Sequence, residues 1–230
     1  MMKKLCTICA KKNSKDLKNK NLKKLAGKPL IYHTLKLAVK SKLFDTIIVS
    51  SDSKKILNYS RKNGASLILE RPFKICKSNT PKIEAIKHAF NHAEKKLNVK
   101  FDYIFDLDVT SPLRNLTDLK KSFQLLKNSK KGNLITICES RKNPYFNMIK
   151  FKGNKIYKFA SSKKKIHSRQ TAPKVFEMNA SIYIWKRNFL LKQKEVVNEN
   201  TLSYEMPLRR SIDIDTKEDW KIVECLWKKN

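Results

Sequence analysis

Short apolar runs alternate with amphipathic segments along most of this chain, and this alternation constrains the fold more than any other feature. The expected strands are residues 5–10, 46–50, 65–69, 102–107 and 134–138. The expected helices begin at Pro29, at Ser51-Asp52, at Thr80-Pro81 and at Thr117. Strands that alternate with helices in this way form a mostly parallel sheet covered by helices on both faces. The sequence therefore predicts one α/β domain over residues 1–230.

The alternation of expected strands and helices ends after the fifth expected strand. Residues 147–151 and 155–159 alternate in polarity around Gly153-Asn154, which is a two-residue hairpin signal. We interpret residues 141–178 as a β arm inserted into the α/β domain.

A cationic loop, residues 11–28, connects the first expected strand to the first helix. It contains eight lysines and a single acid, Asp16. A loop that leaves the C-terminal end of the first strand is where α/β sheets bind ligands, and its backbone N–H groups can form an anion nest. We interpret this loop as a phosphate cradle. The alternative is a solvated lysine run in a chain that is rich in lysine throughout.

Three polar clusters, at residues 10–20, 50–52 and 108–114, follow the ends of expected strands. In an open α/β sheet such ends share one crevice. The third cluster supplies an acid, two hydroxyls and an arginine. Its alternative interpretation is turn chemistry, in which Ser111-Pro112 ends the strand and Thr117 caps the next helix.

Near the C-terminus, residues 180–185 are expected to return to the main sheet and residues 211–214 to form a last short strand. Asp213 and Asp215 stand two residues apart, so on a strand both carboxylates would face the same side. Paired carboxylate oxygens suit Mg²⁺. The alternative is that Asp215 only caps the closing helix.

The net charge of +32 would ordinarily indicate a nucleic acid or an anionic membrane as partner. Only eight of the 52 basic residues are arginine, however, whereas surfaces that grip phosphates and bases favour arginine. A bias towards A/T-rich codons explains the lysines, so we expect no specific nucleic acid and no membrane partner. The cysteines form no second C-x-x-C pair and no apolar run reaches 18 residues, which favours a cytoplasmic protein with reduced thiols.

The chain carries, in order, the blocks AKKNSK, KNKNL, LAGKPLI, LDVTSPLR, EMNASIYIW and SIDIDTKED. Their order and spacing resemble the CMP-sialic acid synthetase family, the cytidylyltransferases that activate nine-carbon acidic sugars. Relatives usually have Arg where this chain has Lys11, Gly where it has Asp16, and Gln-Pro where it has Asp108-Val109. The resemblance implies the three-layer, Rossmann-like nucleotide-diphospho-sugar transferase fold, with a mostly parallel mixed sheet.

The resemblance also implies an activity: transfer of CMP from CTP to the anomeric hydroxyl of a nonulosonic acid of the sialic, legionaminic or pseudaminic type, with release of pyrophosphate. Mg²⁺ is the expected cofactor, and Mn²⁺ could replace it. The alternatives are the same chemistry on Kdo or a sugar phosphate, and a non-catalytic relative that binds polyanions.

Resemblance and polar clusters together select three groups of site residues. The expected nucleotide contacts are Ala10, Lys11, Asn13, Ser14, Lys15, Lys20, Asn21, Arg71 and Asn79. The expected sugar contacts are Asp108, Thr110, Ser111, Arg114, Arg169, Gln170 and Asn179. The alternative for Asp108 is that its carboxylate helps to hold the metal rather than a sugar hydroxyl. The expected catalytic residues are Lys11, Lys20, Asp213 and Asp215, with the two aspartates as metal ligands.

The β arm is too small to have a core of its own, although Phe, Tyr, Ile and Met alternate along it. The resemblance implies that this region lies at a dimer interface and reaches the sugar site of the partner subunit. We therefore expect a homodimer.

Overall fold

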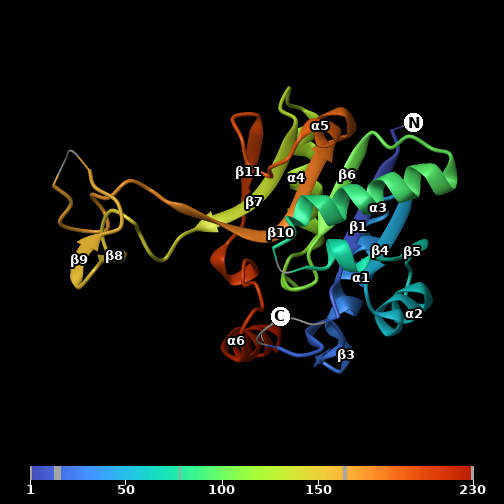
Figure 1. Cartoon of the computed structure of the whole chain (residues 1–230), viewed down its shortest axis with the longest axis horizontal. Helices are drawn as coiled ribbons and strands as arrows, with labels where there is room; N and C mark the ends of the chain where they lie inside the picture. Colours follow the sequence, from blue (N-terminus) through green and yellow to red (C-terminus); the bar gives the residue numbers. More distant parts are fainter. Residues whose placement is uncertain (1, 13–16, 78, 163–164, 229–230) are drawn as a thin grey trace.

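A seven-stranded sheet forms the centre of the computed structural model, which describes residues 2–12, 17–77, 79–162 and 165–228. The strand order is β11-β7-β10-β6-β1-β4-β5 (Figure 1). The strands are β1 (Lys4–Cys9), β4 (Thr46–Ser51), β5 (Leu67–Glu70), β6 (Tyr103–Leu107), β7 (Asn133–Glu139), β10 (Phe176–Lys186) and β11 (Thr201–Glu205). Strand β10 runs antiparallel to β6 and β7, whereas the other neighbours run parallel. The predicted mostly parallel, mixed sheet is confirmed.

The described residues form six α-helices: α1 (Leu30–Ser41), α2 (Lys54–Lys62), α3 (Lys82–Leu97), α4 (Leu116–Lys127), α5 (Arg187–Lys192) and α6 (Lys217–Trp227). Helices α1, α2, α4 and α6 pack with Cys6 and Ile8 of β1 in one apolar cluster. Helices α3 and α5 pack with Leu5 in a second cluster. Successive residues of a strand point to opposite faces, so the sheet is the middle of three layers. None of these described helices is long and apolar enough to span a membrane.

The described part of the cationic loop contains a short 3₁₀ helix, η1 (Lys20–Leu22), and a two-residue ladder between β2 (Lys24–Leu25) and β3 (Lys28–Pro29). The loop packs against the closing helix, and the two lie together near the C-terminus (Figure 1). Lys23 Nζ lies 4.1 Å from the centre of the buried Trp220 ring of α6. Two further 3₁₀ turns are η2 (Phe73–Ile75) and η3 (Leu208–Arg210).

The predicted last strand, residues 211–214, is wrong. Residues 211–215 have no regular secondary structure, and Ile214 N donates a 2.9 Å hydrogen bond to Thr110 O in place of a ladder. Sequence pattern alone did not reveal this, because the buried Ile214 alternates with polar neighbours as it would on a strand. The segment therefore follows the loop after β6, with Ile214 as its apolar anchor.

Two expected helix starts also differ. Ser51 remains paired with Glu70 in the sheet, so α2 is capped by Ser53, whose side chain accepts a hydrogen bond from Ile56 N. Helix α4 is capped by Asn115 rather than Thr117, because Asn115 and Asp118 form a reciprocal capping box.

A bulge interrupts β10 between Met178 and Tyr183, where its pairing with β7 shifts register. Ala180 lies within it at φ 51°, a left-handed conformation that is unfavourable for a residue with a Cβ atom. Asn179 holds the bulge, since its Oδ1 accepts hydrogen bonds from Thr136 Oγ1 (2.6 Å) and Ser181 N (3.2 Å).

We expect Ala180→Gly to raise the free energy of unfolding by about 1 kcal/mol, because glycine adopts positive φ without the steric cost. Urea denaturation followed by circular dichroism measures this effect. The matched control is Ala89→Gly in the buried face of α3, which should lose about 1 kcal/mol or more. A destabilised Ala180→Gly protein would show that the bulge does not strain this residue.

The predicted hairpin signal corresponds to a separate hairpin of β8 (Ile149–Lys152) and β9 (Lys155–Lys158), with Gly153 at φ 59° in its turn. Residues 176–178, which lie within the range expected for the β arm, already belong to β10 and pair with β7. Figure 1 shows the arm projecting from the sheet on the side away from α1, α2 and α3. Its large apolar side chains are exposed: Met148, Ile149, Phe151, Ile156, Tyr157 and Phe159.

Candidate active site

The ends of β1, β4 and β6 bring the three predicted polar clusters together. Ala10 N donates to Ser50 O at 3.0 Å, and Lys12 N donates to the carboxylate of Asp52 at 2.6 Å. Asn21, from the distal part of the cationic loop, donates its side-chain amide to Lys11 O at 2.8 Å. The first and second strand ends therefore share one crevice with the described part of the loop.

A cavity of about 200 Å³ opens at this crevice and is lined by cations from three elements. Lys11, Arg71 and Lys82 line it together with Asp108, so it joins the first cluster to the third. The Lys11 ammonium donates to Lys77 O at 2.9 Å, and the buried Arg71 guanidinium donates to Ser50 Oγ and Ser50 O. Cations that converge on an enclosed volume can bind a polyphosphate.

Of four further expected nucleotide contacts, the structure describes only Asn79. Asn79 is exposed beside Thr80, which lines the cavity. Asn13, Ser14 and Lys15 lie outside the described residues.

The second lysine of the expected catalytic set, Lys20, reaches the C-terminal acidic segment. It is buried, and its ammonium donates to Ile214 O and, at 2.9 Å, to Asp215 Oδ1. This contact joins η1 to the segment that carries both expected metal ligands.

Asp213 and Asp215 have different surroundings. Asp213 is half-buried, and its Oδ1 has no hydrogen-bond partner among the described residues. Burial, and then the negative charge of Asp108, raise the pKa of the Asp213 carboxyl to about 6. The side chain of Asp215 is 69% exposed. Thr216, not Asp215, is the N-cap of α6, so the capping alternative for Asp215 is wrong.

This pair fits a divalent cation, because a buried carboxylate oxygen without a partner is costly until a cation or proton binds it. Hard cations such as Mg²⁺ prefer carboxylate oxygens, and Mg²⁺ is often held by one or two of them together with substrate phosphates. The described residues contain no cluster of three or more His, Cys, Asp or Glu side chains with metal-binding geometry. Because residues 211–215 are not a strand, strand geometry no longer places Asp213 and Asp215 on one side, although the charge of Asp215 does act on Asp213.

Asp108 is engaged through both of its carboxylate oxygens. Its Oδ2 accepts from Lys82 Nζ at 2.6 Å, and its Oδ1 accepts from Thr110 N at 3.2 Å and Thr110 Oγ1 at 3.0 Å. Burial raises the pKa of Asp108, but Lys82 and Thr110 outweigh it, and the pKa falls to about 2.

Three expected sugar contacts are buried and bonded within the protein. Arg114 donates to Ser111 O, Ser181 O and Thr34 Oγ1. Ser111 donates to Asn179 O, and Asn179 donates to Ser211 Oγ. These contacts fix the loop after β6 against the bulge of β10, so the geometry favours a supporting role for the three side chains.

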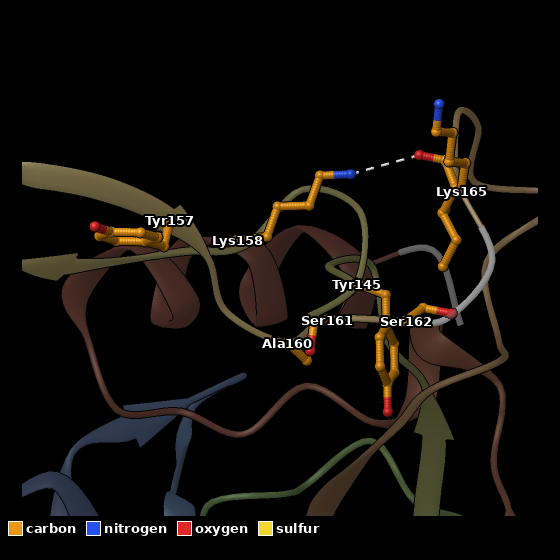
Figure 2. Close-up of a pocket in the computed structure, with 8 residues that line it drawn as sticks. Tyr145, Tyr157, Lys158, Ala160, Ser161, Ser162 and Lys165 are labelled. Carbon is orange, nitrogen blue, oxygen red and sulfur yellow. Dashed lines mark hydrogen bonds between the residues drawn. The ribbon is translucent and has the colours of Figure 1, made fainter.

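The other two expected sugar contacts, Arg169 and Gln170, belong to the β arm and are exposed. Arg169 donates to Ser140 O at 2.9 Å, and no described contact links either residue to Asp108 or Asp213. The arm has a cavity of its own, of about 330 Å³, with Tyr145, Tyr157 and Lys158 among its lining residues (Figure 2). Within one chain, the structure therefore keeps these arm residues apart from the crevice.

Comparisons with known proteins identify the family. A family model described as cytidylyltransferase matches residues 5–229. The chain belongs to the cytidylyltransferase family.

Two curated relatives of this cytidylyltransferase are 38% identical to it. One is the post-translational flagellin modification protein B of Campylobacter coli, aligned over 97% of this chain and 94% of the relative. The other is the CMP-N,N'-diacetyllegionaminic acid synthase of Campylobacter jejuni, aligned over 96% and 94%. A solved CMP-2-keto-3-deoxy-manno-octonic acid synthetase, complexed with CTP, has the same fold, with a TM-score of 0.69, 14% identity and 99% coverage of both chains. The predicted nucleotidyltransferase fold is confirmed.

Sequence reasoning missed Lys82 in this cytidylyltransferase. Besides Asp108, its ammonium lies 3.0 Å from Asp106 Oδ2, and Asp106 is fully buried and accepts from Thr7 Oγ1 at 2.7 Å. One signal was available: a lysine in the first turn of a helix opposes the helix dipole, so an acidic partner was to be expected nearby.

Proposed function

We propose that this cytidylyltransferase transfers CMP from CTP to the anomeric hydroxyl of a nonulosonic acid and releases pyrophosphate. The observation that carries the proposal is the cavity lined by Lys11, Arg71 and Lys82, at a crevice where Oδ1 of Asp213 has no hydrogen-bond partner among the described residues. The name of one relative at 38% identity, a CMP-N,N'-diacetyllegionaminic acid synthase, supports it.

The chain's own residues position the reactants. Lys11 and Arg71 bind the phosphates of the nucleotide, and the acceptor hydroxyl attacks the α-phosphorus in line with the departing pyrophosphate. Lys20 holds Asp215 towards the crevice through its 2.9 Å ion pair. The proposal needs no covalent nucleophile, because transfer of this type depends mainly on positioning and on charge stabilisation.

Mg²⁺, or Mn²⁺ in its place, is the proposed cofactor, with Asp213 and Asp215 as its protein ligands. When bound, it neutralises charge that develops on the phosphates.

We also propose that the protein is a homodimer. The support is the row of exposed apolar side chains on the β arm, together with the separation of Arg169 and Gln170 from the crevice of their own chain. We place the enzyme in the cytoplasm, where CTP is available and the free cysteines stay reduced.

The experiment that tests the proposed function measures pyrophosphate release with each of the four common ribonucleoside triphosphates. The acceptors are N-acetylneuraminic acid, N,N'-diacetyllegionaminic acid, pseudaminic acid and Kdo. We expect CTP and a nine-carbon acid to give at least about tenfold higher kcat/KM than any other pair, which corresponds to a difference of about 1.4 kcal/mol. Equal turnover with UTP, or a preference for Kdo, would contradict the proposal. Binding of heparin that persists in salt, without turnover, would favour a polyanion-binding relative.

A further inference from the structure

Lys82 and its two acidic partners form a partly buried ionic cluster beside the proposed metal site. The Lys82 ammonium lies between Asp106 of β6 and Asp108 just after β6, and 4.6 Å from the centre of the Tyr183 ring. Three partners around one ammonium fix its position, since ion pairs strengthen where solvent is excluded. The cluster therefore determines where the Asp108 carboxylate points.

The charge of Asp108 acts on Asp213, and the Thr110 hydroxyl interacts with both carboxylates, but their oxygens differ in what they contact. Both oxygens of Asp108 accept hydrogen bonds, from Lys82 and from Thr110, whereas Oδ1 of Asp213 has no partner among the described residues. A carboxylate oxygen that pairs with an ammonium is a poorer metal ligand, and the contacts of Asp108 occupy both of its oxygens, whereas Lys20 contacts Asp215 through Oδ1. Asp108 would have to break its ion pair with Lys82 before that oxygen could ligate a metal.

We propose that Lys82 is a positioning residue that holds Asp108 away from the metal, so that the cation binds only Asp213 and Asp215. The inference rests on the proposed function, because it takes these two aspartates as the metal ligands. Lys82 thereby sets the number of carboxylates that can coordinate a cation in this crevice. Without Lys82, one oxygen of Asp108 becomes free beside Asp213, and a third carboxylate adds charge and a ligand.

The test measures Mn²⁺ affinity of the full chain without nucleotide, from the loss of the free Mn²⁺ signal in electron paramagnetic resonance. We expect Lys82→Met to tighten Mn²⁺ binding about tenfold or more, because ligand number and charge set the affinity of oxygen sites. Lys82→Arg keeps the ion pair and should bind Mn²⁺ like the unmutated chain. The double variant Lys82→Met with Asp108→Asn should lose the gain.

Two single variants separate a freed ligand from a general effect of charge. Lys11→Met removes a cation from the same cavity without releasing Asp108, so we expect a change below about twofold. Asp108→Asn should also change Mn²⁺ affinity by less than about twofold, whereas Asp213→Asn should weaken it about tenfold or more.

Lys82→Met leaves Asp106 buried without its cation and could fail to fold. In that case the Mn²⁺ affinity of Asp108→Asn alone tests whether Asp108 is kept from the metal. The inference is overturned if Asp108→Asn weakens Mn²⁺ binding as much as Asp213→Asn does, or if folded Lys82→Met shows no gain. If Asp213→Asn alone leaves Mn²⁺ binding unchanged, the metal assignment fails and the role of Lys82 fails with it. Failure of the metal assignment can be told apart from failure of the Lys82 role, because the Asp213→Asn measurement involves neither Lys82 nor Asp108.

Discussion

Asp213→Asn and Asp215→Asn are each expected to lower kcat/KM by about 10² or more, equivalent to about 2.7 kcal/mol of transition-state stabilisation. The physical reason is that each substitution removes a carboxylate that holds the cation near the reacting phosphates. Initial rates over a range of Mg²⁺ concentrations measure the effect. Near-normal rates at the usual Mg²⁺ requirement in both variants would remove the pair from the mechanism.

A stability measurement separates this role from folding. Because the pKa of Asp213 is raised from 3.8 to about 6, its ionised form opposes folding above pH 6, and this cost disappears as the pH falls through 6 towards 3.8. Metal-free Asp213→Asn should therefore melt at the same or a higher temperature than the unmutated chain at pH 7. At limiting Mg²⁺, activity of the unmutated chain should fall as the pH drops below about 6, since protons then compete with the cation.

Replacing the apolar pair Phe151 and Ile156 by aspartate is expected to convert the proposed dimer into monomers. The two residues face each other across β8 and β9, and their side chains are 69% and 61% exposed in the single chain. Burying a charge in place of an anchor residue costs about 2 kcal/mol or more at an interface, which weakens association at least about thirtyfold per substitution.

Sedimentation velocity measures the mass, and Phe73→Asp is the matched control. Phe73 is 83% exposed but lies in η2, outside the arm, so its substitution should leave the dimer intact. An unmutated chain that sediments at 26.9 kDa at working concentration would contradict the homodimer.

Most strands of the central sheet were predictable from the sequence because they are short apolar runs between helical patterns. The edge strand β11 was missed, because its residues Thr201–Glu205 are largely polar. Leu5, Ile48, Ile104 and Leu134 are all fully buried in the sheet, and burial on both faces is what such runs indicate. Residues 211–214 were misassigned because one buried side chain, Ile214, was enough to imitate strand alternation. The hydrogen bonds that hold this segment come from Thr110 and Lys20, which are about 100 and 200 positions away in the chain. A local sequence pattern cannot predict partners that are so distant in the chain.

The site was predictable in its clusters but not in its contacts. The positions of Lys11 and Asp108 after expected strands indicated that they belong to one crevice, whereas the buried bonds of Arg114 and Asn179 depend on the bulge of β10. Lys82 was missed because its unfavourable position in the first turn of a helix is a weak signal in a lysine-rich chain until its acidic partners are known. Its pairing with Asp106 and Asp108 requires the packing of α3 on β6, which only the fold supplies.

Transfer of the α-phosphate tests the central claim most directly. The protein is incubated with N,N'-diacetyllegionaminic acid and CTP labelled with ³²P at either the α or the γ position. The account predicts that the α label appears in a CMP-sugar and the γ label in pyrophosphate, and that Asp213→Asn forms neither at a comparable rate. Transfer of the γ label to the sugar, or no transfer of either label, would contradict it.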